Sequence, residues 1–161
     1  DGVSYGAPPP VGTTWKQKYI DEVRDDISDA DWSRVHFTGR IPYDEFISLL
    51  QVSRAHVYLT YSFVLSWSLL ETMSAGGAIL ASDTAPVRKV IFDDETELLT
   101  NFFDTDALAD NLNRLLDDAK LRSRLGVAAR QLVLDRFDLE KICLPQQLQW
   151  VDALAQTPVQ P

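Results

Sequence analysis

Cysteine and histidine are scarce in this chain of 161 residues. The single cysteine, Cys143, cannot form a disulfide within the chain, which favours a reducing compartment. The two histidines, His36 and His56, do not combine with it into any zinc-ligand spacing. Both histidines stand in apolar segments, so we expect them to have structural roles.

Basic residues are few relative to acidic ones. The chain has 15 lysines and arginines against 24 aspartates and glutamates, and its formal net charge is −9. Because proteins bind phosphate backbones through an excess of basic side chains, this balance argues against a nucleic-acid partner.

Long hydrophobic runs are also missing. The sequence has no apolar span of about 18 residues, and its first residues, DGVSYGAPPP, lack the basic and apolar regions of a signal peptide. The apolar fraction of 45% and the charged fraction of 24% are typical of a globular protein in water. These features predict a cytoplasmic domain that is large enough to bury a core of its own.

Short apolar runs alternate with helical patterns along the chain. After an irregular lead-in at 1–13, strands are expected at 34–39, 55–61, 78–82 and 97–103. Helices are expected at 14–27, 42–53, 66–77, 85–92, 104–116, 120–137 and 139–154, the last interrupted near Pro145. We expect a single domain, 1–161, in which 138–161 form a C-terminal helix and tail.

This alternation predicts an α/β fold, a parallel sheet with helices on both faces. The segments at 55–61 and 78–82 are almost entirely apolar, as in strands that are buried on both sides. Ligands of such sheets bind at the carboxyl ends of the strands. The loops at 38–42, 61–66 and 82–87 are therefore candidate binding loops.

Glu71 is the one charged residue of the expected helix at 66–77, and two interpretations are open. In the structural one, Ser68 and Glu71 form a capping box at the start of the helix. In the functional one, the carboxylate faces the crevice and accepts two hydrogen bonds from a ribose diol.

Three stretches resemble a known family: VHFTGRIPYDEFISLL, AHVYLTYSFVLSWSLLETMSAGGAILASDTAPVRKVI and DTDALADNLNRLLDD. They are similar, in order and spacing, to the C-terminal donor-binding domain of GT-B glycosyltransferases of family 4, the group 1 type. The resemblance implies a Rossmann-like domain, the C-terminal half of a GT-B fold, without its first strand. It also implies transfer of a sugar from a nucleotide diphosphate sugar to an acceptor, with retention and with no protein-bound metal.

The resemblance assigns roles to individual residues. Gly39, Arg40 and Ile41 fall on the loop that meets the base, and Glu71 falls on the second acid of the Glu-x7-Glu motif, which binds the ribose. The turn that meets the diphosphate corresponds to Val64, Leu65 and Ser66.

Two positions depart from the family pattern. Phe63 replaces the first acid of the motif, which contacts the donor sugar, and Lys89 stands where the family often has a glutamate. A phenyl ring cannot accept hydrogen bonds from a sugar as a carboxylate does. Either the sugar is held otherwise, the substrate differs, or the site has lost activity.

Phe63 keeps a second class of function open, a non-catalytic glycosyltransferase-like binding or assembly module. A nucleotide-sugar epimerase shares the two-domain architecture, but no residue here supports it specifically. The expected partners of the whole protein are the nucleotide-sugar donor and an acceptor glycan or lipid, the latter bound by an N-terminal domain outside this chain. We expect the chain by itself to be inactive, and the whole protein to be cytoplasmic, with peripheral association at the inner membrane face as an alternative.

Overall fold

The computed structural model describes residues 7–61 and 64–156 and divides the chain into two compact units, Asp1–Ile41 and Pro42–Pro161. The first unit contains α1 (Trp15–Val23), a 3-10 turn η1 (Arg24–Asp26) and α2 (Asp29–Trp32). The second unit contains all the strands of the described residues. Whether the whole chain is one domain stays a prediction.

The first unit has no buried residue among those described, 7–41. Its side-chain contacts include stacking between aromatic rings and cation–π contacts. Trp15 stacks on Tyr19 with ring centroids 6.0 Å apart, and the Arg24 guanidinium lies 5.2 Å from the centre of the Trp32 ring. The predicted helix at 14–27 is confirmed over α1, where the Thr14 side chain caps the helix by accepting from the Gln17 N–H.

The strand predicted at 34–39 is wrong. The N–H groups of Arg34 and Val35 donate to the carbonyls of Asp31 and Trp32, so these residues close the end of α2 instead. No strand is formed at 34–39 in the described first unit. A strand is stabilised by the ladder it forms with a neighbour, so a suitable residue pattern alone does not produce one.

The second unit has a parallel sheet in the order β1-β2-β3, with strands His56–Tyr58, Ile79–Ser82 and Leu98–Thr100. Its helical elements are listed here in chain order: α3 (Tyr43–Val52), α4 (Trp67–Ala75), η2 (Val87–Lys89), α5 (Thr105–Asp117), α6 (Ala119–Phe137), η3 (Leu139–Cys143) and α7 (Leu144–Gln156). The expected strands and helices at 42–137 are therefore confirmed. The strands, α3 and α4 are shorter than predicted, the helix at 85–92 is reduced to η2, and α5 and α6 match their predicted bounds within one residue.

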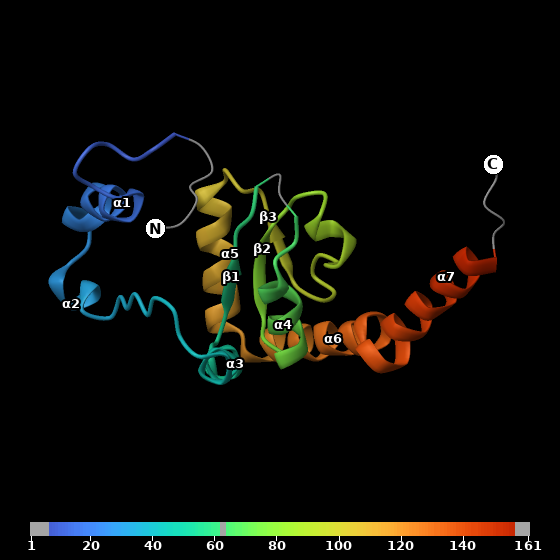
Figure 1. The fold of residues 1–161 in the computed structure, drawn as a ribbon. Helices are drawn as coiled ribbons and strands as arrows, with labels where there is room; N and C mark the ends of the chain where they lie inside the picture. The colour runs from blue at the N-terminus through green and yellow to red at the C-terminus, as the bar shows by residue number, and fades with distance from the viewer. Residues whose placement is uncertain (1–6, 62–63, 157–161) are drawn as a thin grey trace. The chain divides into compact units, whose positions relative to one another are not determined.

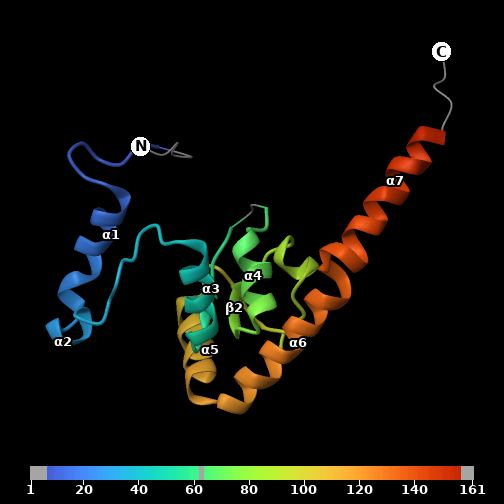
Figure 2. The ribbon, with the colours of Figure 1, turned by 60° about the horizontal axis from the view of Figure 1, so that its bottom comes forward.

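Both faces of the sheet are covered, because successive residues of β2 point to opposite sides and all four are buried. Ile79 and Ala81 belong to a core cluster with Met73 of α4 and Ala129 of α6, whereas Leu80 belongs to a cluster supplied by α5 and the first turns of α6. Figures 1 and 2 show α4 and α5 on opposite sides of the strands. The predicted α/β fold, a parallel sheet with helices on both faces, is confirmed.

Helix α4 ends where the Gly–Gly pair predicts. Gly76 is the C-cap, with a left-handed φ of 76° that glycine adopts without a steric penalty. The turn packs directly on α6, because a Cβ at Gly126 would lie 2.2 Å from the Gly76 carbonyl oxygen. Two glycines thus allow α4 and α6 to approach closely.

Two arginines of α6 connect this helix to the ends of other helices. Arg122 donates to the carbonyls of Leu115 and Leu116 at the end of α5, at 2.6 and 2.8 Å, and Arg130 donates to the Ser74 carbonyl at the end of α4. Cations near the carboxyl end of a helix complement its dipole and satisfy its free carbonyls. The arginines of α6 therefore stabilise the ends of two neighbouring helices.

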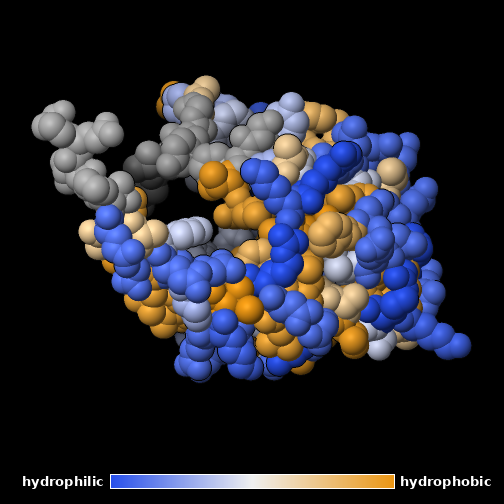
Figure 3. All heavy atoms as spheres, turned by 90° about the vertical axis from the view of Figure 1, so that its right-hand side faces the viewer, coloured by the Kyte–Doolittle hydropathy of each residue, from blue (hydrophilic) through white to orange (hydrophobic). Residues whose placement is uncertain are grey.

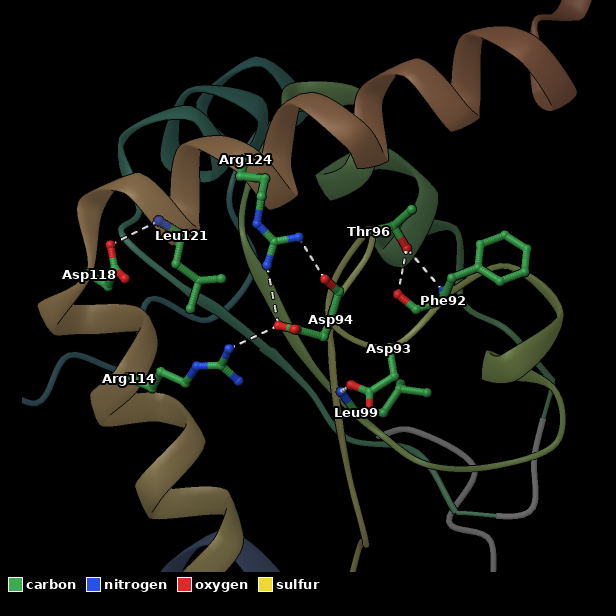
Figure 4. Close-up of polar contacts among 9 residues, drawn as sticks. All are labelled: Phe92, Asp93, Asp94, Thr96, Leu99, Arg114, Asp118, Leu121 and Arg124. Carbon is green, nitrogen blue, oxygen red and sulfur yellow. Dashed lines mark hydrogen bonds and ion pairs between the residues drawn. The ribbon is translucent and has the colours of Figure 1, made fainter.

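The segment before β3 is attached to the helices through Asp94, as Figure 4 shows. The Asp94 carboxylate accepts from Arg114 of α5 at 2.9 Å and from Arg124 of α6 at 3.2 Å, and its carbonyl accepts from Arg124 at 2.6 Å. Asp94 has a φ of 54°, a conformation that aspartate tolerates better than most residues. This one residue joins a turn to two helices.

The interruption predicted near Pro145 is wrong, because α7 follows η3 directly and Pro145 is its second residue. Leu148, Trp150, Val151 and Leu154 of α7 are all exposed. Figure 3 shows hydrophobic surface on the side of the molecule where α7 lies in Figure 1. Over the described residues, no helix is both long enough and apolar enough to cross a bilayer.

Candidate nucleotide-binding site

Glu71 is the fifth residue of α4, which begins at Trp67 with Ser66 as its N-cap. The Ser66 hydroxyl accepts from the Ser68 N–H at 3.3 Å, so Ser68 lies inside the first turn. The capping-box interpretation of Ser68 and Glu71 is therefore wrong, because it requires Ser68 to stand at the N-cap itself. The Glu71 carboxylate is left for other partners.

One such partner comes from the start of α3, which packs beside α4 (Figures 1 and 2). The Tyr43 hydroxyl donates to Glu71 Oε1 at 2.9 Å, and this hydrogen bond raises the pKa of Tyr43 above its ordinary value. Tyr43 is 64% exposed. The pair therefore lies at the surface, where a ligand can reach both side chains.

Tyr43 and Glu71 line a hollow of about 200 Å³ between α3, α4 and α6. Its other polar lining residues include Gln51, Ser74 and Arg130. A carboxylate accepts hydrogen bonds, whereas a guanidinium and an amide group donate them, so the hollow offers groups of both kinds to hydroxyls. The sequence did not indicate Tyr43, although it directly follows the candidate loop at 38–42.

The turn before α4 is fixed by a residue that sequence reasoning missed. Tyr58, the buried last residue of β1, accepts a hydrogen bond from the Ser66 N–H through its hydroxyl at 2.8 Å. Of the three N–H groups predicted to meet the diphosphate, that of Ser66 is therefore already engaged. The N–H groups of Val64 and Leu65 have no partner within the described part of the chain. Phe63 lies outside the described residues.

Gly39, Arg40 and Ile41 end the first unit, whereas Glu71 belongs to the second. Gly39 has a φ of 63°, which favours glycine at this position. Val64, Leu65 and Ser66 directly precede α4, and Glu71 is the fifth residue of that helix.

Asp83, at the end of β2, does not cap the short helix that follows. The N-cap of η2 is Pro86, and the Asp83 carboxylate instead forms an ion pair with Arg88. Arg88 Nη2 donates to Asp83 Oδ2 at 2.5 Å, and this pairing holds the pKa of Asp83 below its usual range. Trp67, the first residue of α4, is 81% exposed.

The next feature is the distribution of possible metal ligands in the part of the chain that the structure describes. No group of three or more histidine, cysteine, aspartate or glutamate residues there could hold a metal ion. His56 is partly buried, which lowers its pKa below the ordinary value, so its ring is neutral at physiological pH.

Comparison with known proteins identifies the class. The family model described as "Glycosyl transferases group 1" matches residues 15–132. N-acetyl-alpha-D-glucosaminyl L-malate synthase of Bacillus anthracis is 30% identical over 121 residues, which cover 75% of this chain and 31% of that protein. Alpha-D-kanosaminyltransferase of Streptomyces kanamyceticus is 30% identical over 106 residues, which cover 66% of this chain and 28% of that protein.

Solved structures agree on the fold. Sucrose-phosphate synthase from Thermosynechococcus elongatus superposes with a TM-score of 0.76 at 23% identity, over 94% of this chain and 38% of that one. The C-terminal domain of a glycosyl transferase group 1 family protein from Francisella tularensis gives a TM-score of 0.69 at 22% identity, over 82% of this chain and 67% of that one. HepE of Anabaena, solved in complex with UDP, gives 0.70 at 19% identity, over 93% of this chain and 42% of that one.

The fold is thus that of the Rossmann-like C-terminal domain of GT-B proteins. The chain belongs to the group 1 family of glycosyl transferases. It spans 28% to 31% of the length of these curated relatives.

Proposed function

We propose that this chain is the donor-binding part of a glycosyltransferase that transfers a sugar from a nucleotide diphosphate sugar to an acceptor with retention. The observation that carries the proposal is the position of Glu71, whose carboxylate lines an open hollow one turn beyond the start of α4. There it accepts hydrogen bonds from the two ribose hydroxyls of the donor, as carboxylates do in other nucleotide sites. Gly39, Arg40 and Ile41 contact the base.

The diphosphate is bound by backbone at the start of α4. The N–H groups of Val64 and Leu65 and the positive end of the helix dipole provide the attraction. Arg88 contributes little in the observed arrangement, because Asp83 already neutralises it. We propose that no metal ion takes part and that cations from elsewhere in the whole protein complete the charge balance.

HepE of Anabaena has been solved with UDP and with UDP-glucose, and this supports a nucleotide-sugar donor for a chain of the same fold. The acceptor, a glycan or a lipid, is bound by another part of the whole protein. That protein is cytoplasmic, or is attached peripherally to the inner face of the membrane.

The test measures nucleotide binding by the whole protein. UDP, GDP and ADP are screened by thermal shift, and we expect one of them to raise the melting temperature. Glu71→Ala should weaken the binding of that nucleotide about tenfold or more, because two hydrogen bonds to a charged group are lost. Glu140→Ala, at an exposed acid of η3, is the matched control. Unchanged affinity of the Glu71 variant would contradict the ribose assignment.

The alternative is a non-catalytic binding or assembly module, and Phe63 is the observation that favours it. If the protein is such a module, the unmodified whole protein does not transfer or hydrolyse any donor that it binds. The Phe63→Glu variant then gains donor hydrolysis. Turnover by the unmodified protein excludes the alternative.

A further inference from the structure

A second hollow lies beside the carboxyl end of β3, and its lining shares no residue with that of the hollow at Glu71. Its volume is about 390 Å³. Ligand sites typically occupy about 300–1,000 Å³, so this hollow has room for a small ligand. Its lining includes one aromatic residue, Phe92, and six polar residues: Asp83, Arg88, Asp93, Glu95, Thr100 and Asn101.

Two of the three carboxylates in this hollow are held in place. Asp83 is paired with Arg88. Asp93 Oδ1 accepts from the Leu99 N–H at 2.8 Å, a contact drawn in Figure 4. The third, Glu95, is exposed, and its side chain has no hydrogen bond or ion pair within the described residues. The site therefore combines a fixed polar wall with one carboxylate that is available to a ligand.

The charges of the lining limit the class of ligand. Three carboxylates face one guanidinium, which disfavours a phosphate or another anion. Carboxylates accept hydrogen bonds and guanidinium groups donate them, so a ligand that satisfies both kinds must carry groups that donate and accept. Hydroxyl groups do both, whereas an ammonium group only donates. Within the described residues, no group of three or more histidine, cysteine, aspartate or glutamate residues is arranged to hold a metal ion.

The hollow also has an apolar wall. Phe92 is 42% exposed, and Ile91 and Leu99 lie beside it in the lining. A ligand that fits must therefore present an apolar face as well as hydroxyls. A pyranose ring has this character, because its C–H groups form a face that packs on an aromatic ring while its hydroxyls project from the edge.

An exposed aromatic surface continues from the hollow. Asn101 Oδ1 accepts from the Phe103 N–H at 2.9 Å, so Asn101 joins the lining to the loop after β3. The ring of Phe103, which is 70% exposed, lies 4.9 Å from that of Tyr61 and 5.1 Å from that of Phe102. These mutually packed rings offer a second apolar surface at the carboxyl edge of the sheet.

We propose that this hollow is a second saccharide-binding site, which holds a neutral pyranose between Phe92 and the carboxylate of Glu95. Asp83, Arg88 and Asn101 fix the orientation of the sugar through its remaining hydroxyls. Phe103 and Tyr61 stack on a following sugar of the same glycan. The site requires no nucleotide and is independent of the nucleotide site at Glu71.

Saturation-transfer NMR on the whole protein tests the site with four probes at millimolar concentration. They are the methyl α-pyranosides of glucose, galactose and mannose and methyl N-acetyl-β-D-glucosaminide. At least one should receive saturation at its ring protons. Glu95→Ala and Phe92→Ala should each weaken its binding about tenfold, since one removes a charged hydrogen bond and the other an aromatic contact. Glu140→Ala should bind as the unmodified protein does.

Measuring nucleotide affinity in the same variants tests this site separately from the one at Glu71. Both hollow variants should retain their melting temperature and their affinity for the nucleotide, and Glu71→Ala should retain its affinity for the pyranoside. Three results would overturn the proposal. None of the four probes receives saturation, or both hollow variants bind the sugar as tightly as the unmodified protein does, or inorganic phosphate displaces the sugar.

Discussion

The hydroxyl of Tyr43 donates a hydrogen bond of 2.9 Å to Oε1 of Glu71, a residue 28 positions further along the chain. The bond connects the first residue of α3 to the middle of α4. It leaves Glu71 Oε2 and the second lone pair of Oε1 for a ligand, since a carboxylate can accept about four hydrogen bonds. Tyr43 thus orients the carboxylate in the position where the proposed ribose binds.

Loss of the Tyr43 hydroxyl, which orients Glu71, should weaken nucleotide binding without destabilising the fold. Tyr43→Phe deletes one hydroxyl from an exposed pair, so the affinity should fall by about twofold to tenfold, corresponding to one hydrogen bond. The free energy of unfolding should change by less than about 0.5 kcal/mol, as for most surface substitutions. Calorimetric titration of the variant with the nucleotide found for the unmodified protein measures the first effect, and urea unfolding measures the second. An unchanged affinity would show that Tyr43 does not act through Glu71.

Gly126 should be intolerant of a side chain. Because a Cβ there would stand 2.2 Å from the carbonyl oxygen of Gly76, Gly126→Ala must push α6 away from the turn after α4. Overpacking of this kind costs about 1–3 kcal/mol. Helix propensity alone predicts the opposite sign, a gain of about 1 kcal/mol for alanine. Urea unfolding distinguishes a loss of stability from a gain. Val127→Ala, on the exposed side of α6, is the control.

The parts of the fold that follow from local pattern were predictable, and those that depend on a distant partner were not. β2 and the end of α4 follow from an apolar run and a glycine pair, and the structure confirms both. The expected strand at 34–39 alternates polar and apolar residues and has no long apolar run, and the structure has no strand there. In the site, Glu71 stood out as an acid in an apolar helix, whereas Tyr43 and Tyr58 did not. Their hydroxyls matter only because the fold brings them to Glu71 and to the Ser66 N–H.

Exposed apolar residues on α7 should cause the chain of residues 1–161 to self-associate. Leu148, Val151 and Leu154 recur at helical spacing and are all exposed, so each has apolar surface to bury against a second copy. Sedimentation velocity should show dimers or larger species at high concentration. Leu148→Glu combined with Val151→Glu should shift the distribution to monomer, and Gln147→Glu should not. A monomer at all concentrations would contradict the expectation.

Glu97 is a fully buried acid at the start of β3. Its Oε2 accepts from the Ile79 N–H, and its Oε1 has no partner among the described residues. Burial raises the pKa of Glu97 to about 9 from an ordinary value of 4.5. The carboxyl is therefore protonated in the folded protein at neutral pH, while the same group in the unfolded chain is ionised.

This difference should make the protein less stable as the pH rises. Between about pH 5 and about pH 9 the folded state binds one more proton at Glu97 than the unfolded state, so the free energy of unfolding falls by up to about 1.4 kcal/mol per pH unit from this group. Glu97→Gln keeps the shape and does not titrate. We expect its stability, relative to the unmodified protein, to rise steadily over that range in urea unfolding, and Glu140→Gln should show no such trend. A stability difference that is constant with pH would mean that Glu97 is ionised in the folded state, and the sheet would then have to accommodate a buried charge beside the Ile79 N–H.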